Sequence, residues 1–397
     1  MREVAEMKRK FLLTALLTVL LTGGCIYDFD PQVEGGQQFL VVEGDILVGD
    51  MSEFTVSWTR DLSVLADEAT RYEPGSLRIV CDDGSSLEAM SMSGRFLLDT
   101  RGLSPDRKYR VELSISGDNV CTDWLEVHKA GVLDSLNYVI DPLTKEQMWI
   151  CVTAHAEDSD EKYFRWRCEE TWEYHAQYMA GYYYVKDSRY GKVLPFENGE
   201  NTFWCWKEGR VSDIMVASTA DLSDPRFICH KLYSIGNTES KASYLYSPQV
   251  VQTAVSEEAY RYWAALSRNT ADVGGLFSPQ PSECRGNLRS ERNPDKLVLG
   301  YVSASTVAKK RIFVSEGLDF FYKGRSSGVS PEYIAKELWP MKYSAGMRPY
   351  QPHYVEGADD LDPIAMDMYE WLPSECVECT RQGGTKNKLV WWPNDHK

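Results

Sequence analysis

The body of this chain alternates short apolar and β-branched runs with turn signals, and this pattern restricts it to a mainly β fold. Residues 53–59 read EFTVSWT, an alternation with the period of two that a half-buried strand requires. Similar runs occupy residues 39–48, 77–81, 95–98 and 109–115. Strands separated by turns over about 90 residues are typical of an immunoglobulin-like β-sandwich. We place this sandwich at residues 36–130.

A larger β-rich domain is expected at residues 131–397. Strands are predicted at 148–154, 163–174, 181–187, 211–218, 227–236, 243–253, 296–304 and 311–315. Two helices interrupt them. Residues 256–268 begin with Ser256 as N-cap and two glutamates in the first turn, which favour a helix N-terminus. Residues 330–338 have Pro331 at the first helical position and Pro340 after the end.

The first 25 residues have the layout of a lipoprotein signal. Lys8, Arg9 and Lys10 precede an apolar run from Phe11 to Leu21, and Gly23 and Gly24 precede Cys25. The run is shorter than the roughly 20 residues that cross a bilayer as a helix. We expect a signal peptide at 1–24, lipidation of Cys25 and a tether at 25–35. Thr22 stands where such signals usually have leucine, so ordinary cleavage with an unmodified Cys25 is the alternative, and Met7 is an alternative start.

Charge and cysteine content limit the partners and the compartment. The chain has 43 Lys and Arg against 59 Asp and Glu, a net charge of −16, which argues against nucleic-acid binding. Of the 10 cysteines, Cys25 is the predicted lipidation site. The others lie in an oxidising compartment, and because their number is odd they cannot all pair within the chain. The predicted disulfides are Cys81–Cys121, Cys151–Cys168 across a hairpin centred near Asp160, and Cys376–Cys379. Cys205, Cys229 and Cys284 remain unassigned.

No motif predicts catalysis, a metal or a cofactor. The sequence has no HExxH, no glycine-rich phosphate loop and no GxSxG elbow. Cys376 and Cys379 form a CxxC that lacks the second ligand pair of a zinc site. A dense aromatic segment is the one candidate for contact with a ligand or partner: Trp172, Tyr174, Tyr178, Tyr182, Tyr183 and Tyr184. Flat rings can stack on sugars, but packing in the core or against a partner is the favoured interpretation.

Several motifs in a fixed order resemble a known family. They are Phe39–Gly44, Tyr244–Trp263, Gly274–Pro279, Gly286–Leu288, Val298–Ser305, Lys310–Val314, Pro373–Cys379 and Gly383–Thr385. Together with the lipid signal they resemble the domain-of-unknown-function family 4249, over nearly all of the mature chain. The end departs from the family pattern, because it reads Val390-Trp391-Trp392-Pro393.

The resemblance implies a location and a neighbour. Members are Bacteroidota outer-membrane lipoproteins whose genes lie beside those of TonB-dependent (SusC-like) receptors. We therefore expect a non-catalytic lipoprotein, anchored in the outer membrane and facing the cell exterior, that assists a TonB-dependent transporter in capturing a nutrient. The alternatives are an adhesin-like protein that binds glycans or proteins, and a surface hydrolase.

Overall fold

The structure is a computed structural model that describes residues 38–59, 75–157, 160–197, 202–271, 285–315, 329–352 and 368–393. The predicted signal peptide, the tether and Cys25 lie outside these ranges, as do Cys284 and the motif Gly274–Pro279. Within the described ranges, no helix is both long and apolar enough to cross a membrane.

A first β-sandwich is built from two five-stranded sheets. One sheet has the order β21 (Val298–Leu299), β1 (Leu40–Gly44), β3 (Met51–Trp58), β7 (Arg95–Asp99) and β6 (Met90–Met92). The other has the order β20 (Leu288–Ser290), β9 (Asp118–Thr122), β8 (Tyr109–Ile115), β4 (Gly75–Cys81) and β5 (Ser86–Glu88). Alternation explains the shared core: along β8, Tyr109, Val111, Leu113 and Ile115 are buried and the residues between them are not.

This sandwich is completed by a segment from much later in the chain. β20 pairs with β9, and β21 runs parallel to β1. A small third sheet holds β22 (Ala304–Thr306) between β10 (Val127–His128) and β2 (Ile46–Val48). Leu288, Val298 and Val302 lie in the core of the first sandwich. The sandwich placed at residues 36–130 therefore also contains strands from 288–306.

Gly300 marks a close approach between this segment and β1. Its φ is +116°, and a Cβ added there would lie 1.9 Å from the carbonyl oxygen of Val42. No L-residue fits that backbone without moving β1.

We expect Gly300→Ala to lower the free energy of unfolding by about 2 kcal/mol or more, because it combines backbone strain with the steric clash. Urea unfolding would measure this, with Gly102→Ala as the control because a Cβ at Gly102 meets nothing within 4 Å; equal effects would contradict the expectation.

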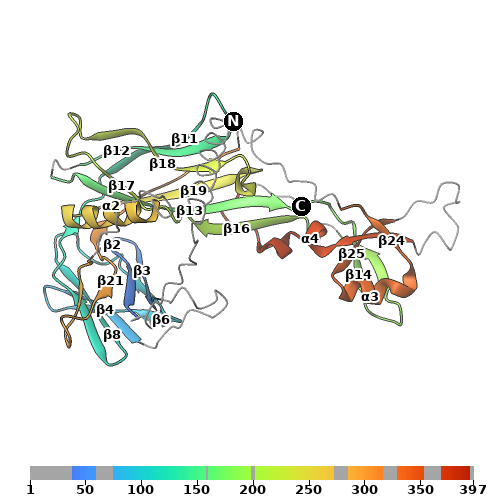
Figure 1. Ribbon diagram of the computed structural model, residues 1–397, viewed down its shortest axis with the longest axis horizontal. Coiled ribbons are helices and arrows are strands. Elements are labelled where there is room, and N and C mark those ends of the chain that lie inside the picture. The colour runs from blue at the N-terminus through green and yellow to red at the C-terminus, as the bar shows by residue number, and fades with distance from the viewer. Residues whose placement is uncertain are drawn as a thin grey trace, which may run out of the picture. The chain divides into compact units, whose positions relative to one another are not determined.

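A second sandwich follows, and Figure 1 shows its two sheets as separate layers. One sheet has the order β11 (Val132–Ile140), β12 (Gln147–His155) and β18 (Arg226–Gly236). The other has the order β16 (Trp204–Arg210), β13 (Tyr163–His175), β19 (Tyr246–Ala254) and β23 (Ala308–Arg311), with β17 (Met215–Ser218) also paired to β13. Their common core contains Ile150, Trp166 and Val250. The predicted hairpin of 148–154 with 163–174 is wrong, because β12 and β13 belong to opposite sheets.

One of the two predicted helices is confirmed and the other is wrong. α2 spans Glu257–Ala271, and the Ser256 hydroxyl accepts a hydrogen bond from the Ala259 N–H at 3.2 Å, as an N-cap should. The 330–338 segment instead forms β24 (Glu332–Ile334), which pairs with β26, and the 3-10 turn η3 (Lys336–Leu338). The helix α3 begins only at Trp339 and ends at Ser344. Pro340 thus lies in its first turn and does not end a helix.

The remaining elements, most of them near the C-terminus, form small sheets and short helices. β24, β26 (Tyr369–Pro373) and β25 (Met347–Pro352) make one sheet, and β14 (Tyr182–Val185) pairs with β15 (Lys192–Pro195). Short helical segments complete the described chain: η1 (Ser240–Ala242), α4 (Ser374–Val377) and η5 (Cys379–Gln382). The expected fold class, mainly β with an N-terminal immunoglobulin-like sandwich and a larger β-rich region carrying short helices, is confirmed.

Candidate functional site

The predicted aromatic segment packs within the protein. The Tyr174 hydroxyl donates to the Cys379 carbonyl at 2.7 Å, and that of Tyr178 donates to the Val329 carbonyl at 2.9 Å. Tyr184 is buried beside Trp371, with ring centroids 5.9 Å apart.

The other three rings are partly buried. Tyr182 packs on Tyr369 at 5.2 Å and Tyr183 on Phe196 at 5.1 Å, between ring centroids. Trp172 packs against the core of the second sandwich. These contacts support the core interpretation, since each of the six rings packs on other side chains or bonds to the backbone of the protein.

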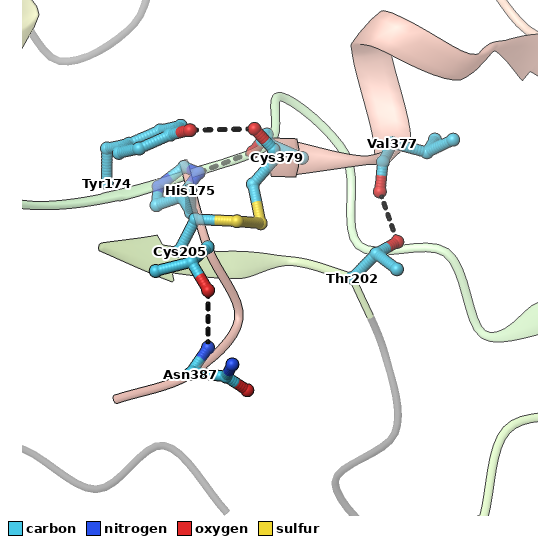
Figure 2. Close-up of a disulfide and its surroundings, with 9 residues drawn as sticks. Tyr174, His175, Thr202, Cys205, Val377, Cys379 and Asn387 are labelled. Carbon is cyan, nitrogen blue, oxygen red and sulfur yellow. Dashed lines mark hydrogen bonds between the residues drawn. A yellow bond between two sulfur atoms is a disulfide. The ribbon is translucent and has the colours of Figure 1, made fainter. Parts of the chain in front are cut away.

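The disulfide in the structure joins two cysteines that the sequence analysis did not pair. Cys205 on β16 is bonded to Cys379 on η5, with Cα atoms 5.7 Å apart and a sequence separation of 174 (Figure 2). Thr202 and Val377 lie beside the bond, where the Thr202 hydroxyl donates to the Val377 carbonyl at 2.9 Å. The predicted Cys376–Cys379 bridge is therefore wrong. Among the described residues, no group of three or more His, Cys, Asp or Glu side chains could hold a metal ion.

The two other predicted disulfides are also absent. Cys81 and Cys121 are unbonded thiols on β4 and β9 of one sheet, with β8 between them. Cys151 and Cys168 are unbonded and lie on β12 and β13, in opposite sheets. The assumed hairpin was the reason for pairing them, and it does not form.

Cys168 instead joins a buried polar network. Its sulfur lies 3.1 Å from the Tyr233 hydroxyl, which lies 2.7 Å from the Tyr246 hydroxyl. Tyr246 donates to Glu170, whose carboxylate also accepts from Lys241 at 3.0 Å. Burial raises the pKa of Cys168 to about 12, so the thiol stays protonated. The network satisfies buried polar groups rather than preparing a nucleophile.

The two sandwiches meet through paired charges. Asp45, between β1 and β2, is 4% exposed and accepts from the Arg165 guanidinium at 2.9 Å and from the Ser303 N–H at 3.1 Å. Arg167 lies 3.4 Å from the same carboxylate. Two further pairs cross the junction, Asp50 with Lys309 and Glu53 with Arg210. Carboxylates of the first sandwich thus face cations of the second.

Beside this junction lies a charged cleft of about 590 Å³. We define it by its lining residues, which come from β3, β7, β13, β16 and β23: Glu53, Thr55, Arg95, Glu169, Glu170, Thr171, Glu208, Gly209, Arg210 and Arg311. Its volume is within the range of pockets that hold small molecules. The lining is polar, so the cleft suits a hydrophilic ligand.

Two guanidinium groups in the cleft are held by one carboxylate. Arg95 donates to Glu53 at 2.6 Å, and Arg210 donates to the other oxygen of Glu53 at 2.9 Å. At the opposite side, Arg311 donates to Gln249 at 2.8 Å and lies 4.1 Å from the ring centroid of Trp391. Carboxylates and guanidinium groups arranged in this way can accept from and donate to hydroxyl, amide or charged groups of a ligand.

Comparison with known proteins now adds a family. The model of a family described as "Domain of unknown function (DUF4249)" matches residues 26–311, well over half of the chain. The chain belongs to the DUF4249 family. The matched residues include both sandwiches, whereas the expected motifs Pro373–Cys379 and Gly383–Thr385 lie beyond them.

Neither of the other comparisons extends this assignment. The comparison with curated proteins finds no match. Among solved structures, the chain is similar to a two-domain fibronectin type-III segment from chicken tenascin, at 11% identity, covering 55% of this chain and 91% of that chain, with a TM-score of 0.16. A TM-score this low carries no argument, so the fold class rests on the strands themselves.

The charged junction of this DUF4249 protein and the cleft beside it were not predicted, although one signal for the junction was present. Along β13, Phe164, Trp166 and Cys168 face the core, so the alternate residues Arg165, Arg167 and Glu169 must face outward. A strand with an apolar face and two arginines on the opposite face indicates that the second face contacts carboxylates. The carboxylates that meet it lie about 120 residues earlier, as with Asp45 and Arg165.

Glu53 gives the cleft a pH dependence. Burial alone would raise the pKa of Glu53, but hydrogen bonds from Arg210 and Arg95 outweigh it and lower the pKa below its ordinary value of 4.5. A lowered pKa adds stability that is present above pH 4.5 and is lost as the pH falls through the lowered value. We expect the unfolding free energy of Glu53→Gln to fall less than that of the wild type between pH 6 and about pH 3. In urea titrations, the exposed Glu88→Gln should behave as wild type, and identical pH profiles for all three would contradict the expectation.

Proposed function

We propose that this protein is a non-catalytic outer-membrane lipoprotein, anchored through Cys25 and exposed at the cell surface, that assists a TonB-dependent transporter in nutrient uptake. The charged cleft holds a small hydrophilic ligand in this role. The observation that carries the proposal is the cleft itself, since both sandwiches supply its walls and paired charges hold those walls together.

Three features support the proposal from independent directions. The order of a basic start, an apolar run and Gly23-Gly24-Cys25 suits lipid attachment followed by an aqueous body. The chain belongs to the DUF4249 family. The ion pairs at the junction preorganise the cleft, and preorganisation lowers the cost of ordering side chains when a ligand binds.

The location and the partner are tested together in cells of the source organism. The full-length protein, tagged at its C-terminus and expressed at native level, should co-purify with a TonB-dependent barrel from detergent-solubilised outer membranes. Cys25→Ser should remove the protein from the membrane fraction, because the acyl chains that anchor it cannot be attached. Surface exposure should make the tag of the wild type accessible to protease in intact cells. Repeated failure to recover a barrel, with the protein still in the membrane, would contradict the transporter role.

The cleft is tested with a matched pair of arginine variants. Arg311→Ala removes a guanidinium that lines the cleft, whereas Arg101→Ala removes an exposed guanidinium paired with Asp99 outside it. Ligands retained from a library of oligosaccharides and peptides should be lost with Arg311→Ala and kept with Arg101→Ala. Equal retention by both variants would contradict a binding role for the cleft.

A further inference from the structure

Two cysteines outside the cleft lie unusually close together. Cys151 on β12 and Cys229 on β18 have their sulfur atoms 2.7 Å apart. This separation exceeds the S–S bond of about 2.05 Å. It is nevertheless shorter than the contact distance of two unbonded sulfur atoms, so a pair of thiols would have to separate or bond.

The sheet geometry explains how the sulfurs meet. Cys151 pairs with Lys231 and Val152 with His230, and the register of β12 and β18 then shifts before Ala154 pairs with Phe227. Cys229 falls at this irregularity with a φ of +45°, and its N–H donates to the Thr153 hydroxyl at 3.2 Å. Bulges re-aim side chains, and here the bulge directs Cys229 toward Cys151.

The surroundings of Cys151 and Cys229 favour a bond between the two thiols. The core of the second sandwich takes Ile150 and Val152 from β12, so Cys151 points to the other face of the sheet. Cys151 is buried there, whereas Cys229 is exposed. Burial, together with the neighbouring Cys229 thiol, raises the pKa of Cys151 to about 12, so the exposed Cys229 is the thiol suited to attack first.

We propose that Cys151 and Cys229 form a second disulfide, which joins β12 to β18 across the bulge. The oxidant is a protein or small-molecule disulfide in the compartment where Cys205–Cys379 also forms. Cys229 thiolate attacks the donor disulfide, forms a mixed disulfide and releases one donor thiolate. Cys151 then loses its proton to solvent, attacks the Cys229 sulfur and releases the second donor thiolate. The two cysteine thiols are oxidised by two electrons, and the donor disulfide is reduced to two thiols.

The proposed bond would close a second long segment of the chain. Cys151 and Cys229 are 78 residues apart, and the segment between them contains β13, β16 and β17. The bond would therefore restrict the unfolded chain, and in the folded state it would fix the bulge between β12 and β18.

The test is a disulfide map of the full chain purified from cells. Free thiols are blocked with iodoacetamide without reduction, and the protein is digested with trypsin. Cys151 lies in the peptide 146–162 and Cys229 in the peptide 227–231. We expect these two peptides to be joined, at their summed mass less two hydrogens, in protein that migrates as a monomer on a non-reducing gel. The linked Cys205–Cys379 peptides in the same digest are the control for oxidation.

Two outcomes of the disulfide map would overturn the proposal. One is alkylation of both Cys151 and Cys229 in a digest where Cys205–Cys379 is linked. The other is a link from either cysteine to a different one. The variant Cys229→Ser gives a second readout that does not depend on folding, because labelling is done in urea. Without reductant, iodoacetamide should alkylate Cys151 in this variant. In the wild type it should alkylate Cys151 only after reduction. Equal labelling of both proteins in urea would also overturn it.

Discussion

Replacing Asp45 with alanine is expected to lower the free energy of unfolding by about 3–5 kcal/mol, because it leaves a buried guanidinium without its counter-ion. The Arg165 side chain is 15% exposed and stacks at 3.7 Å from the ring centroid of Trp263 on α2. Burial already lowers the pKa of Arg165, and the Asp45 charge opposes that effect. The Ser303 N–H loses its acceptor in the same variant.

Urea unfolding followed by tryptophan fluorescence would measure the effect. The control is Asp99→Ala, which breaks an exposed pair with Arg101 and should change little. The double variant Asp45→Ala/Arg165→Met should recover part of the loss, since it removes the unpaired charge while keeping much of the packing volume. If Asp45→Ala and Asp99→Ala have the same unfolding free energy, the junction does not depend on this ion pair.

Cys205→Ser is expected to destabilise the protein by about 2–5 kcal/mol, because the native bond closes a long loop and restricts the unfolded chain. The sequence separation of 174 makes this loop longer than the proposed Cys151–Cys229 loop. The bond also holds the C-terminal segment on the edge of β16, where Trp206 and Thr385 exchange two backbone hydrogen bonds of 2.9 Å.

Thermal unfolding would measure the loss of stability, and limited proteolysis would measure the attachment of the C-terminal segment. After cleavage between residues 205 and 379, the wild-type C-terminal fragment should remain attached on a non-reducing gel, and in Cys205→Ser it should be released. Cys376→Ala is the matched control, because Cys379 bonds to Cys205 and not to Cys376. Release of the fragment from the wild type as readily as from Cys205→Ser would refute the structure's pairing, because a Cys376–Cys379 bridge would lie within the fragment and could not hold it.

Local periodicity accounts for what sequence analysis predicted well. The alternation in β8 and in the first part of β13, and the N-cap of α2, are each encoded within a few residues. The helix predicted at 330–338 is wrong for a related reason. Ser330 and Pro331 suit a helix start, but they also suit the residues before a short strand, and pairing of β24 with β26 decided between the two.

The cysteines and the cleft needed information that no local pattern carries. The pairing of Cys151 with Cys168 assumed that neighbouring strands form a hairpin, yet β12 and β13 lie in opposite sheets. Cys205 had no predicted partner because Cys379 lies 174 residues away. The charged residues of the cleft come from five strands, and none of them forms a recognisable motif with its own neighbours.

The sequence by itself determined that this protein is mainly β, where most of its longer strands run, and which side chains face a core along a strictly alternating strand such as β8. The physical reason is that the period of two is a property of one strand and its own solvent exposure. Only the tertiary structure decided that 288–306 completes the first sandwich, that Asp45 meets Arg165, and that Cys205 bonds to Cys379. A strand's periodicity says which face is buried but not which distant strand covers it, and every one of these contacts depends on that choice.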